Sequence, residues 1–504
     1  MNATPQTTIE DIERFLRGSP IELVRFAFCD QHGIFRGKTL TAKYAVEAIR
    51  NGLPMVGTLL LKDTASRTAF PTFDPVAFGQ ITETNPSLAS FANASDVLMR
   101  ADPPTFHVLP WAPNIAWIQC QTHDRHGNLS PFDTRGQLQT ALRKLASFGY
   151  GMRCGLEVEF HVYKLDDPKL APEESSWPAP APRVSMIHPG NNVLCEQWAD
   201  MSDEPLRIIL KTAQSLGLPI RSLEIELGPS QVECVFDVQD ALAAADSMAL
   251  FRNATKQALR RAGYHATFMC RPQFPNIVSS GWHLHQSLYD QKSGANAFSI
   301  PTSPSMGDGR VVTNEDHFRA RASNVLSPVG AHWLAGLLAH AHASCAFAVP
   351  TINGYARYQP NMMAPQRAIW GVGSRGAALR VVASGHANDP ATRIENRLGE
   401  PAANPYLYIA SQIHAGLDGI ARDLESPHAG VAPYSDDSTD ALPISLADSV
   451  SLLDLDEIFC NGFGRDFVKY FAHIKRHEIA RFSATQSDAA QTKDWQQREY
   501  FSLF

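Results

Sequence analysis

The chain has 504 residues, a formal net charge of −7, and a composition that is 44% hydrophobic and 19% charged. These values are typical of a globular protein that is long enough for two domains. An acidic chain of this kind lacks the basic surface that binds nucleic acid or an anionic membrane, so we expect neither partner.

The N-terminal residues MNATPQTTIEDIERFL show no basic segment followed by an apolar run, so no secretory signal is expected. The most apolar stretch, residues 332–350, contains three histidines and favours a buried helix over a membrane span. The eight cysteines are scattered without a C-x-x-C pair, which predicts buried free thiols in a reducing compartment. We therefore expect a cytoplasmic protein.

The first elements indicate a small domain that contains a sheet. Residues 21–40 predict two strands around a turn at Gln31–Gly33. The fragment GIFRGK resembles part of a phosphate loop, but its spacing is too short, so we interpret it as a basic hairpin. The prolines of residues 102–114 suggest a boundary, and we expect residues 1–116 to form this domain and residues 117–504 the larger one.

Strands and helices alternate irregularly along the larger part. Strand periodicity covers residues 155–163, 221–236 and 281–290; helical periodicity covers residues 134–149, 204–218, 240–263, 314–347 and 464–482; a proline-rich stretch at 165–185 predicts a surface loop. This order indicates an α+β fold rather than a doubly wound one.

The strand GLEVEFHVY, residues 155–163, raises the first chemical question. Its carboxylates Glu157 and Glu159 are two residues apart, so both point to one face of the strand. At about 4 Å, two like charges repel by about 4 kcal/mol at an effective dielectric constant near 20. Such a pair needs a countercharge.

Three further segments place charged or imidazole groups at the same spacing of two. They are residues 223–233, with Glu226, Glu233 and, if the strand is regular, Glu224; residues 281–287, with His283 and His285; and residues 393–398, with Arg393, Glu395 and Arg397. Each set alone is compatible with a solvated strand face. Together, on strands of Leu, Ile, Val and Phe, they favour a buried polar funnel, where carboxylates crowd only around a cation. Carboxylate oxygens with one imidazole suit Mg²⁺ or Mn²⁺, so we expect Glu157 and Glu159 to face metal.

Arginines dominate the C-terminal third. Residues 355–381 and 393–398 contain Arg357, Arg375, Arg380, Arg393 and Arg397. One such arginine is more often a surface ion pair, but the guanidinium fork also suits carboxylate and phosphate oxygens. A metal site beside an arginine cluster indicates phosphoryl transfer from a nucleoside triphosphate.

The ordered motifs from about residue 95 to the C-terminus resemble the glutamine synthetase family. They are SDVLMRADPPTFHVLPW, GLEVEF, EIELGPSQVE, SGWHLHQSL, NGYARYQP, GSRGAALRV, RIENRL and PAANPYLYIASQIHAGLDGI. The resemblance implies an N-terminal β-grasp domain and a C-terminal glutamine synthetase-type catalytic domain with a curved antiparallel sheet. It also implies a homo-oligomer of two stacked hexameric rings with active sites between neighbouring subunits.

The same resemblance implies a role for each matched residue. One metal ion is expected on Glu159, Glu226 and Glu233, and another on Glu157, His283 and Glu395, in a site that holds two or three Mg²⁺ or Mn²⁺ ions. ATP is expected beside His285 and Ser287, with Arg380 and Arg393 on its phosphates. Glutamate and the transferring phosphoryl group are expected on Arg357, Arg375, Arg397 and Ser279, and catalysis depends on Arg375, Glu159 and Arg357. Glutamate would accept the γ-phosphoryl group of ATP, and an amine would attack the γ-glutamyl phosphate.

The chain departs from the family pattern where ammonia-using members bind ammonium. Their flap has a glutamate before Ala-Pro, whereas this chain has Met363 in NMMAPQ. Their DGSS loop is absent, and Asp63 in residues 59–67 is the nearest equivalent. A thioether in place of a carboxylate favours an apolar amine over ammonium, which needs fixed negative charge. Trp282, where relatives have methionine, is either a packing change or a wall of the amine pocket.

These departures predict the branch that joins glutamate to larger amines, including γ-glutamylanilide synthases. Aniline is neutral at pH 7 and needs no carboxylate to bind. The alternatives are an alkylamine or polyamine such as isopropylamine or putrescine, ammonia with the flap carboxylate moved, or another acid donor. A non-catalytic relative is a further alternative, although all six metal-ligand positions are filled.

Overall fold

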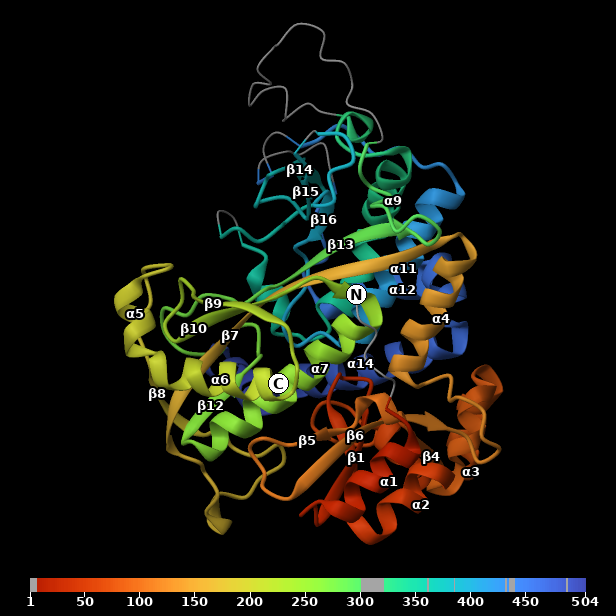
Figure 1. The fold of residues 1–504 in the computed structure, drawn as a ribbon, viewed down its shortest axis with the longest axis vertical. Helices are drawn as coiled ribbons and strands as arrows, with labels where there is room; N and C mark the ends of the chain where they lie inside the picture. The colour runs from red at the N-terminus through yellow and green to blue at the C-terminus, as the bar shows by residue number, and fades with distance from the viewer. Residues whose placement is uncertain are drawn as a thin grey trace, which may run out of the picture.

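The computed structural model describes residues 7–300, 321–359, 362–384, 386–430, 433–434, 440–485 and 488–504. Within these residues the chain forms two β-sheets and the helices packed on them (Figure 1). The start of the helical segment expected over 314–347 lies outside the described residues, and α9 (Pro328–Ala339) and α10 (Ala341–Ala348) form the rest.

The smaller sheet belongs to the N-terminal part, at the bottom of Figure 1. Its strands β1 (Leu23–Cys29), β2 (Phe35–Thr41), β3 (Leu53–Val56), β4 (Asp96–Ala101), β5 (His107–Val108) and β6 (Ile115–His123) are arranged as β2-β1-β6-β4-β3, with β5 on β6. The expected pair of strands is confirmed as β1 and β2, with the turn closed by a hydrogen bond from Gly33 N to Asp30 O. Arg36 pairs with Asp30 at 2.8 Å, so GIFRGK is a hairpin strand.

The boundary expected after residue 116 falls inside β6. Residues Ile115–His123 form one continuous strand that pairs with β1, β4 and β5, so the N-terminal sheet extends to His123. The prolines of residues 102–114 lead into this strand rather than out of the sheet, because they form a short 3-10 turn and β5.

The larger sheet is organised around β7 (Tyr150–Asp167), a strand of 18 residues. The strand order is β14-β15-β16-β13-β7-β10-β9, and β8, β11 and β12 also pair with β7. The bounds are β8 (Arg183–Met186), β9 (Ile220–Ile225), β10 (Gln231–Phe236), β11 (Gln239–Asp240), β12 (Tyr264–Thr267), β13 (Trp282–Asp290), β14 (Trp370–Val372), β15 (Leu379–Val382) and β16 (Arg393–Asn396). Apart from the parallel pair of β14 and β15, its pairs are antiparallel.

Helices cover one face of β7. Leu156, Val158 and Phe160 on that face are fully buried, and Phe160 meets Phe251 of α7 (Ala241–Arg261) edge to face. Both α7 and α4 (Thr134–Ser147) contact β7, and α11 (Pro405–Ala421) packs on α4, α7 and α9. The residues that alternate with these apolar ones point to the opposite face of β7. They include Glu157 and Glu159.

The remaining helices of the described residues surround the two sheets. They are α1 (Ile9–Gly18), α2 (Ala42–Asn51), α3 (Pro75–Thr84), α5 (Glu196–Met201), α6 (Asp203–Ser215), α12 (Leu446–Leu455), α13 (Glu457–Phe463), α14 (Arg465–Thr485) and α15 (Ala489–Tyr500), with short 3-10 helices at Gly57–Leu61, Pro86–Ala94, Pro103–Thr105, Pro172–Glu174, Ala322–Asn324 and Gly354–Arg357. The predicted helices at 134–149, 204–218, 240–263 and 464–482 are confirmed as α4, α6, α7 and α14. Tyr470 of α14 donates to Leu60 O, so this helix joins the N-terminal part to the larger one.

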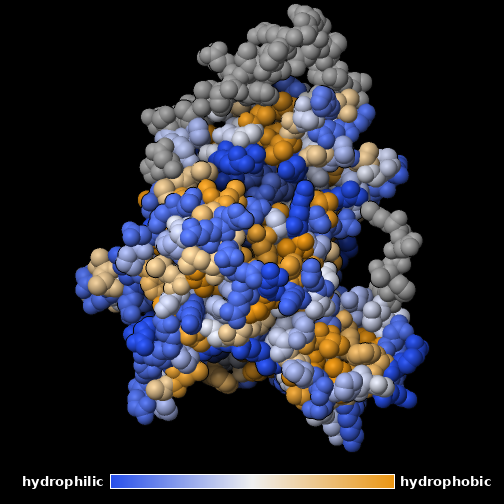
Figure 2. All heavy atoms as spheres, turned by 60° about the vertical axis from the view of Figure 1, so that its left-hand side comes forward, coloured by the Kyte–Doolittle hydropathy of each residue, from blue (hydrophilic) through white to orange (hydrophobic). Residues whose placement is uncertain are grey.

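Hydrophobic residues form separate patches among hydrophilic ones on the face seen in Figure 2. Among the described residues, none of the helices has the length and apolarity required to cross a membrane, and residues 332–350 fold into α9 and α10 as a break near His340 separates them. The eight cysteines are free and all but Cys195 are buried, as the scattered pattern predicts.

Candidate active site

The strand register of the larger sheet brings the predicted acidic residues together. On β7, Glu159 lies opposite Glu233 of β10, and Glu157 lies opposite His283 of β13. On the next strand along, Glu395 of β16 lies opposite His285. Four strands therefore supply one face with carboxylates and imidazoles, because each keeps its apolar residues for the other face.

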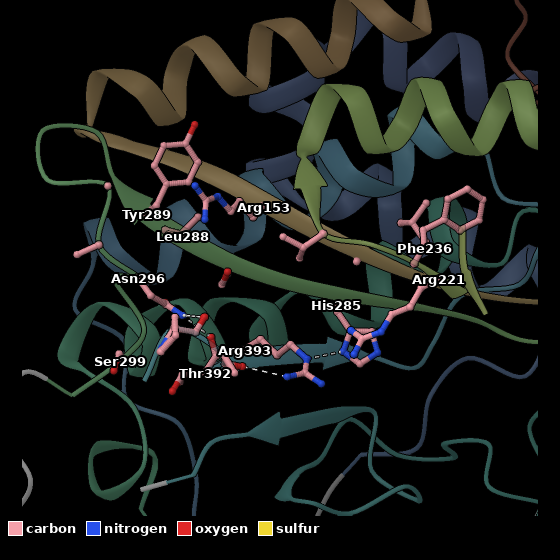
Figure 3. A pocket seen from close by; sticks show the side chains of 18 of the residues that line it. Arg153, Arg221, Phe236, His285, Leu288, Tyr289, Asn296, Ser299, Thr392 and Arg393 are labelled. Atoms are coloured by element: carbon pink, nitrogen blue, oxygen red, sulfur yellow. Dashed lines mark hydrogen bonds between the residues drawn. The ribbon is translucent and has the colours of Figure 1, made fainter. Parts of the chain in front are cut away.

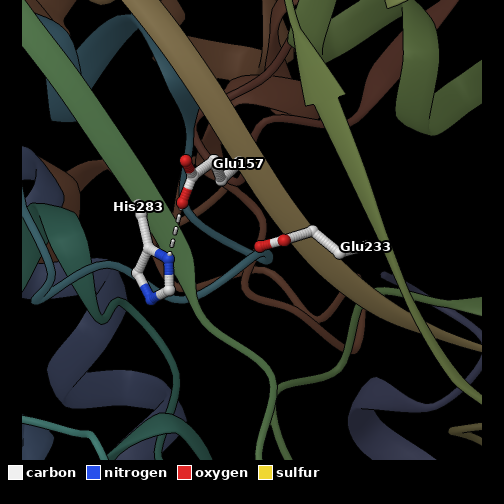
Figure 4. Close-up of side chains that lie close together, drawn as sticks. All are labelled: Glu157, Glu233 and His283. Atoms are coloured by element: carbon white, nitrogen blue, oxygen red, sulfur yellow. Dashed lines mark hydrogen bonds and ion pairs between the residues drawn. The ribbon is translucent and has the colours of Figure 1, made fainter. Parts of the chain in front are cut away.

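These side chains form three overlapping groups whose ligand atoms lie within 4.8 Å of one another. The groups are Glu159, Glu226 and Glu233; Glu157, Glu233 and His283; and Glu157, His285 and Glu395. In Figure 4, the ring of His283 meets the carboxylate of Glu157 at 3.4 Å, and Glu233 points into the same space from β10. Glu226 comes from the turn after β9, where its backbone N–H donates to Gln231 O.

The first set of expected metal ligands lies together in the structure, and the second set gains one additional residue, His285. Glu159, Glu226 and Glu233 lie together as the sequence predicts. Beside Glu157, the structure brings in both histidines: His283 Nδ1 lies 3.8 Å from Glu395 Oε1, and His285 Nε2 lies 2.9 Å from Glu157 Oε1.

The charges of this cluster are unbalanced on the β10 side. Burial, and after it the charge of Glu159, raises the pKa of Glu233 to about 10. Burial and the charge of Glu226 raise the pKa of Glu159 to about 7, and burial followed by Glu224 raises the pKa of Glu226. Three carboxyl groups therefore resist ionisation unless a cation is supplied.

On the β13 side, hydrogen bonds from imidazoles and the positive charge of guanidinium groups stabilise the carboxylates. Burial opposes ionisation of Glu157, but hydrogen bonds from His283 and His285 hold its pKa well below the ordinary value. Burial likewise opposes ionisation of Glu395, whereas the charges of His283 and Arg397 lower its pKa to about 2. Burial and then Arg397 lower the pKa of His283 to about 4, which leaves the neutral imidazole that binds metals. Ionised oxygens with an imidazole fit Mg²⁺ or Mn²⁺.

A cavity of about 520 Å³ opens beside the cluster (Figure 3). Glu157 and His285 stand at its border with the carboxylates, and Ser287 and Arg393, both predicted to bind nucleotide, also line it. Arg393 Nε donates to His285 Nδ1 at 3.0 Å, which fixes both side chains at the metal end. The volume of the cavity suits a ligand of drug or nucleotide size. Arg380, also expected on the phosphates, instead donates to Glu395 Oε2 at 2.8 Å.

The sequence analysis missed several other residues that line this cavity (Figure 3). They include Arg153, Arg221, Phe236, Tyr289, Asn296 and Thr392. Two of them had a signal in the sequence: Arg153 lies four residues before Glu157 and Tyr289 four after His285, so each continues the alternation of its strand. The Arg153 guanidinium lies over the Tyr289 ring at 5.1 Å.

Of the three arginines expected to hold glutamate, two are buried beside the cluster and one is exposed. Arg357 is buried, donates to Arg397 O at 2.8 Å, and lies 3.4 Å from His283 Nε2. Arg397, also buried, donates to Glu395 and to Met363 O. Arg375 is exposed in the turn between β14 and β15, and no hydrogen bond or ion pair among the described residues joins it to the cluster. Ser279 is tied to the site, because Gln231 Nε2 donates to both Ser279 O and Glu159 Oε2.

The three residues expected around the amine lie in three different environments in the structure. Met363 has a left-handed backbone (φ 51°) and an exposed side chain, while its carbonyl accepts from Arg397 at 3.2 Å. Trp282 is fully buried edge to face on Tyr408 and alternates with His283 along β13, so it is a packing residue rather than a cavity wall. Asp63 is fully buried too, and it accepts from Arg481 Nε at 2.6 Å and His477 Nδ1 at 2.8 Å. Within its own chain Asp63 is thus already neutralised.

The comparisons with known proteins agree with this geometry. The model of the glutamine synthetase catalytic domain matches residues 131–494. The chain is 38% identical to the gamma-glutamylanilide synthase of an Acinetobacter species over 96% of this chain and 93% of that protein. It is 29% identical to the gamma-glutamylethanolamide synthetase of Streptomyces coelicolor over 99% and 97%. The solved GmaS/ADP complex superposes with a TM-score of 0.72 at 25% identity, over 95% of this chain and 97% of that one.

The chain therefore belongs to the glutamine synthetase family. It is an ATP-dependent ligase that joins glutamate to an amine and works with a divalent metal such as Mg²⁺ or Mn²⁺.

Proposed function

We propose that the amine is apolar and aromatic, with aniline as the simplest example. The observation that carries this proposal is Met363, which stands before Ala-Pro in the flap and next to Arg397, where ammonia-using relatives place a carboxylate. A thioether offers no charge to an ammonium ion but packs well against an aromatic ring. The similarity to a gamma-glutamylanilide synthase supports the same substrate.

The residues of the site divide the work as follows. Glu159, Glu226 and Glu233 would hold one divalent ion, and Glu157, His283 and Glu395, with His285 beside them, a second. When bound there, such ions would supply the positive charge that neutralises the phosphate oxygens during transfer. Arg393, His285 and Ser287 bind the nucleotide phosphates, Arg380 holds Glu395 in place, and Ser279, Arg357, Arg375 and Arg397 orient glutamate and the transferred phosphoryl group.

The chemistry then needs no ammonium site. The γ-carboxylate of glutamate attacks the γ-phosphorus of ATP and ADP leaves, which gives γ-glutamyl phosphate. A neutral arylamine attacks the acyl carbon, phosphate leaves, and the nitrogen loses its proton once the bond has formed. Because aniline is unprotonated at pH 7, it needs no carboxylate to bind, and a methionine at position 363 does not weaken its binding.

We further propose that the N-terminal sheet, up to His123, forms a β-grasp domain that meets the active site of a neighbouring subunit in a double ring. The exposed position of Arg375 is consistent with a site that a second copy completes. Sedimentation of the purified protein tests this arrangement, since a double hexamer is twelve times the 55.4 kDa chain.

An alkylamine is the second candidate, and the similarity to a gamma-glutamylethanolamide synthetase favours it. Aniline, ethanolamine, isopropylamine, putrescine and ammonia should be compared with ATP, glutamate and Mg²⁺ or Mn²⁺, with phosphate release and product mass as the two measurements. Highest kcat/KM with aniline supports the proposal. Dominant turnover of ethanolamine or another alkylamine supports the second candidate, and dominant turnover of ammonia contradicts both.

A further inference from the structure

Gln231, in the motif EIELGPSQVE, is the first residue of β10 and is fully buried. Because side chains alternate along a strand, it lies on the same face of β10 as Glu233. Across the pair with β7, Gln231 lies opposite His161 and Glu233 lies opposite Glu159. A buried and uncharged amide therefore lies among the carboxylates, and its hydrogen bonds indicate its role.

The amide of Gln231 connects the turn between β9 and β10 to Glu159. Its Oε1 accepts a hydrogen bond from Gly228 N at 2.9 Å, and its Nε2 donates to Glu159 Oε2 at 3.2 Å. The same nitrogen lies 3.0 Å from Ser280 Oγ and 3.4 Å from Ser279 O. These partners fix the direction of the amide, because a rotated amide would set its N–H groups against the N–H of Gly228 and its oxygen against a carboxylate.

Two donors converge on one oxygen of Glu159. Gly281 N donates to Oε2 at 2.8 Å, which is the atom that also accepts from Gln231. The other oxygen, Oε1, accepts no hydrogen bond from the described part of the chain and lies 3.8 Å from His283 Nε2. A carboxylate that is held by one oxygen presents the other oxygen to a cation in a defined direction.

The backbone of Gln231 holds the segment of a second metal ligand. Glu226 N donates to Gln231 O at 3.0 Å, and Gln231 N donates to Gly228 O at 3.1 Å, so the turn between these residues is closed. A Cβ at Gly228 would stand 2.5 Å from Gln231 Oε1, so the close approach of the amide requires a glycine there. Glu233, the third ligand, follows two residues later on β10. One residue is therefore linked to the segments that carry all three carboxylates.

We propose that Gln231 is a positioning residue of the metal site. Its amide orients Glu159 and supports the turn that presents Glu226, so that these two carboxylates and Glu233 meet one divalent cation in a fixed arrangement. This inference rests on the proposed function in one respect, the assignment of the three carboxylates to one ion. Residues that hydrogen-bond to metal ligands typically contribute about 10-fold to 100-fold in metal affinity.

Gln231→Met tests the proposal, because it keeps an unbranched side chain of similar length and removes the amide. The matched control is Gln137→Met on α4, which changes another buried glutamine whose Nε2 donates to Pro131 O rather than to the cluster. Mn²⁺ binding to the metal-free protein is followed by electron paramagnetic resonance without nucleotide. We expect one ion to bind about 10-fold to 100-fold more weakly in Gln231→Met, with the other ions unchanged and Gln137→Met equal to wild type. Unchanged binding of every ion in Gln231→Met would overturn the proposal.

Glu159→Ala in the same titration separates this inference from the proposed function. This variant should lose the ion that Gln231→Met weakens. If Glu159→Ala loses an ion and Gln231→Met binds every ion like wild type, Gln231 is not a positioning residue although the metal assignment stands. If neither variant alters Mn²⁺ binding, the assignment of the three carboxylates fails first, and the inference falls with it.

The dependence of activity on metal distinguishes positioning from a general loss of structure. Because Gln231→Met weakens a metal site without removing a ligand, its kcat should be low at limiting Mn²⁺ and should return to within about threefold of wild type at saturating Mn²⁺. Gln231→Asn keeps an amide that is one carbon too short to reach both Gly228 and Glu159. It should show the same weakened ion and the same recovery, and it serves as the second variant if the thioether prevents folding. A kcat that stays low at saturating Mn²⁺ in a folded variant would contradict a positioning role.

Discussion

Two clusters of buried charge in this chain are balanced in different ways. Around Asp63, three buried carboxylates meet cations of the same chain: Asp63 binds Arg481 and His477, Glu499 binds Arg481, and Glu478 binds Lys475 at 3.2 Å. On β7 and β10, Glu159 and Glu233 face each other, and burial and mutual repulsion raise the pKa of both. The first cluster is complete as a structural joint, whereas the second requires bound cations. A buried carboxylate therefore indicates a metal or ligand site only when no cation of the same chain neutralises its charge.

The largest expected effect comes from emptying the unbalanced cluster. Glu159→Ala should lower ADP formation with glutamate and aniline by at least about 10³-fold, because a lost metal ligand removes several kcal/mol of transition-state stabilisation. The metal-free protein should keep its urea midpoint, since the substitution relieves repulsion. Glu173→Ala, at an exposed position in the proline-rich loop, is the control and should retain activity. Near-normal activity of Glu159→Ala would remove it from the site.

The balanced cluster should show the opposite pattern. Asp63→Ala leaves Arg481 and His477 without their shared carboxylate, so the free energy of unfolding should fall by about 3–5 kcal/mol. Urea titration followed by fluorescence measures it. Asp494→Ala breaks an exposed pair with Arg498 and should cost less than about 1 kcal/mol. If Asp63→Ala instead changes the amine preference at unchanged stability, the expectation that Asp63 lies in an amine pocket is right after all.

The flap offers a smaller and more selective change. Met363→Glu restores the carboxylate of ammonia-using relatives, and it should lower kcat/KM for aniline about tenfold while improving ammonia relative to aniline. Met362→Glu changes the neighbouring exposed methionine and serves as the control. An amine preference equal to wild type in Met363→Glu would exclude Met363 from the amine site.

The smallest effect expected is on the pH dependence of metal binding. The raised pKa values, about 7 for Glu159 and about 10 for Glu233, mean that the metal-free protein keeps protons there which a cation must displace. The apparent affinity for Mn²⁺ should therefore rise with pH from 6 to 9, with proton release that shrinks over the same range. Without metal, stability should fall as pH rises through these values. Calorimetry in buffers of different ionisation enthalpy measures the proton release, and a flat affinity would contradict the raised pKa values.

Much of this arrangement was predictable because strands alternate with a period of two. That rule places Glu157 and Glu159 together on one face of β7, and His283 and His285 together on one face of β13, and the strand register then brings the two pairs to the same face of the sheet. The same rule, carried further, reaches Arg153 and Tyr289 in the nucleotide cavity. Local periodicity also predicts helices such as α4 and α14.

Contacts between residues far apart in the chain could not be predicted from the sequence. Asp63 meets its partners 414 and 418 residues further along, so nothing near it distinguishes an ion pair from a substrate ligand. The apolar environment of Trp282 depends on Tyr408 of α11 in the same way. The expected boundary at 116 was based on the prolines of residues 102–114, and in the structure these prolines precede the longest strand of the first sheet.

Transfer of isotopic oxygen tests the central claim most directly. Glutamate labelled with ¹⁸O in its γ-carboxylate should be incubated with the protein, ATP, Mg²⁺ and aniline, and the released phosphate analysed by mass spectrometry. If the carboxylate is phosphorylated at the β7 cluster before amide formation, one ¹⁸O atom appears in each phosphate released with γ-glutamylanilide. Amide formed together with unlabelled phosphate, or ATP left intact with every amine supplied, would contradict the account.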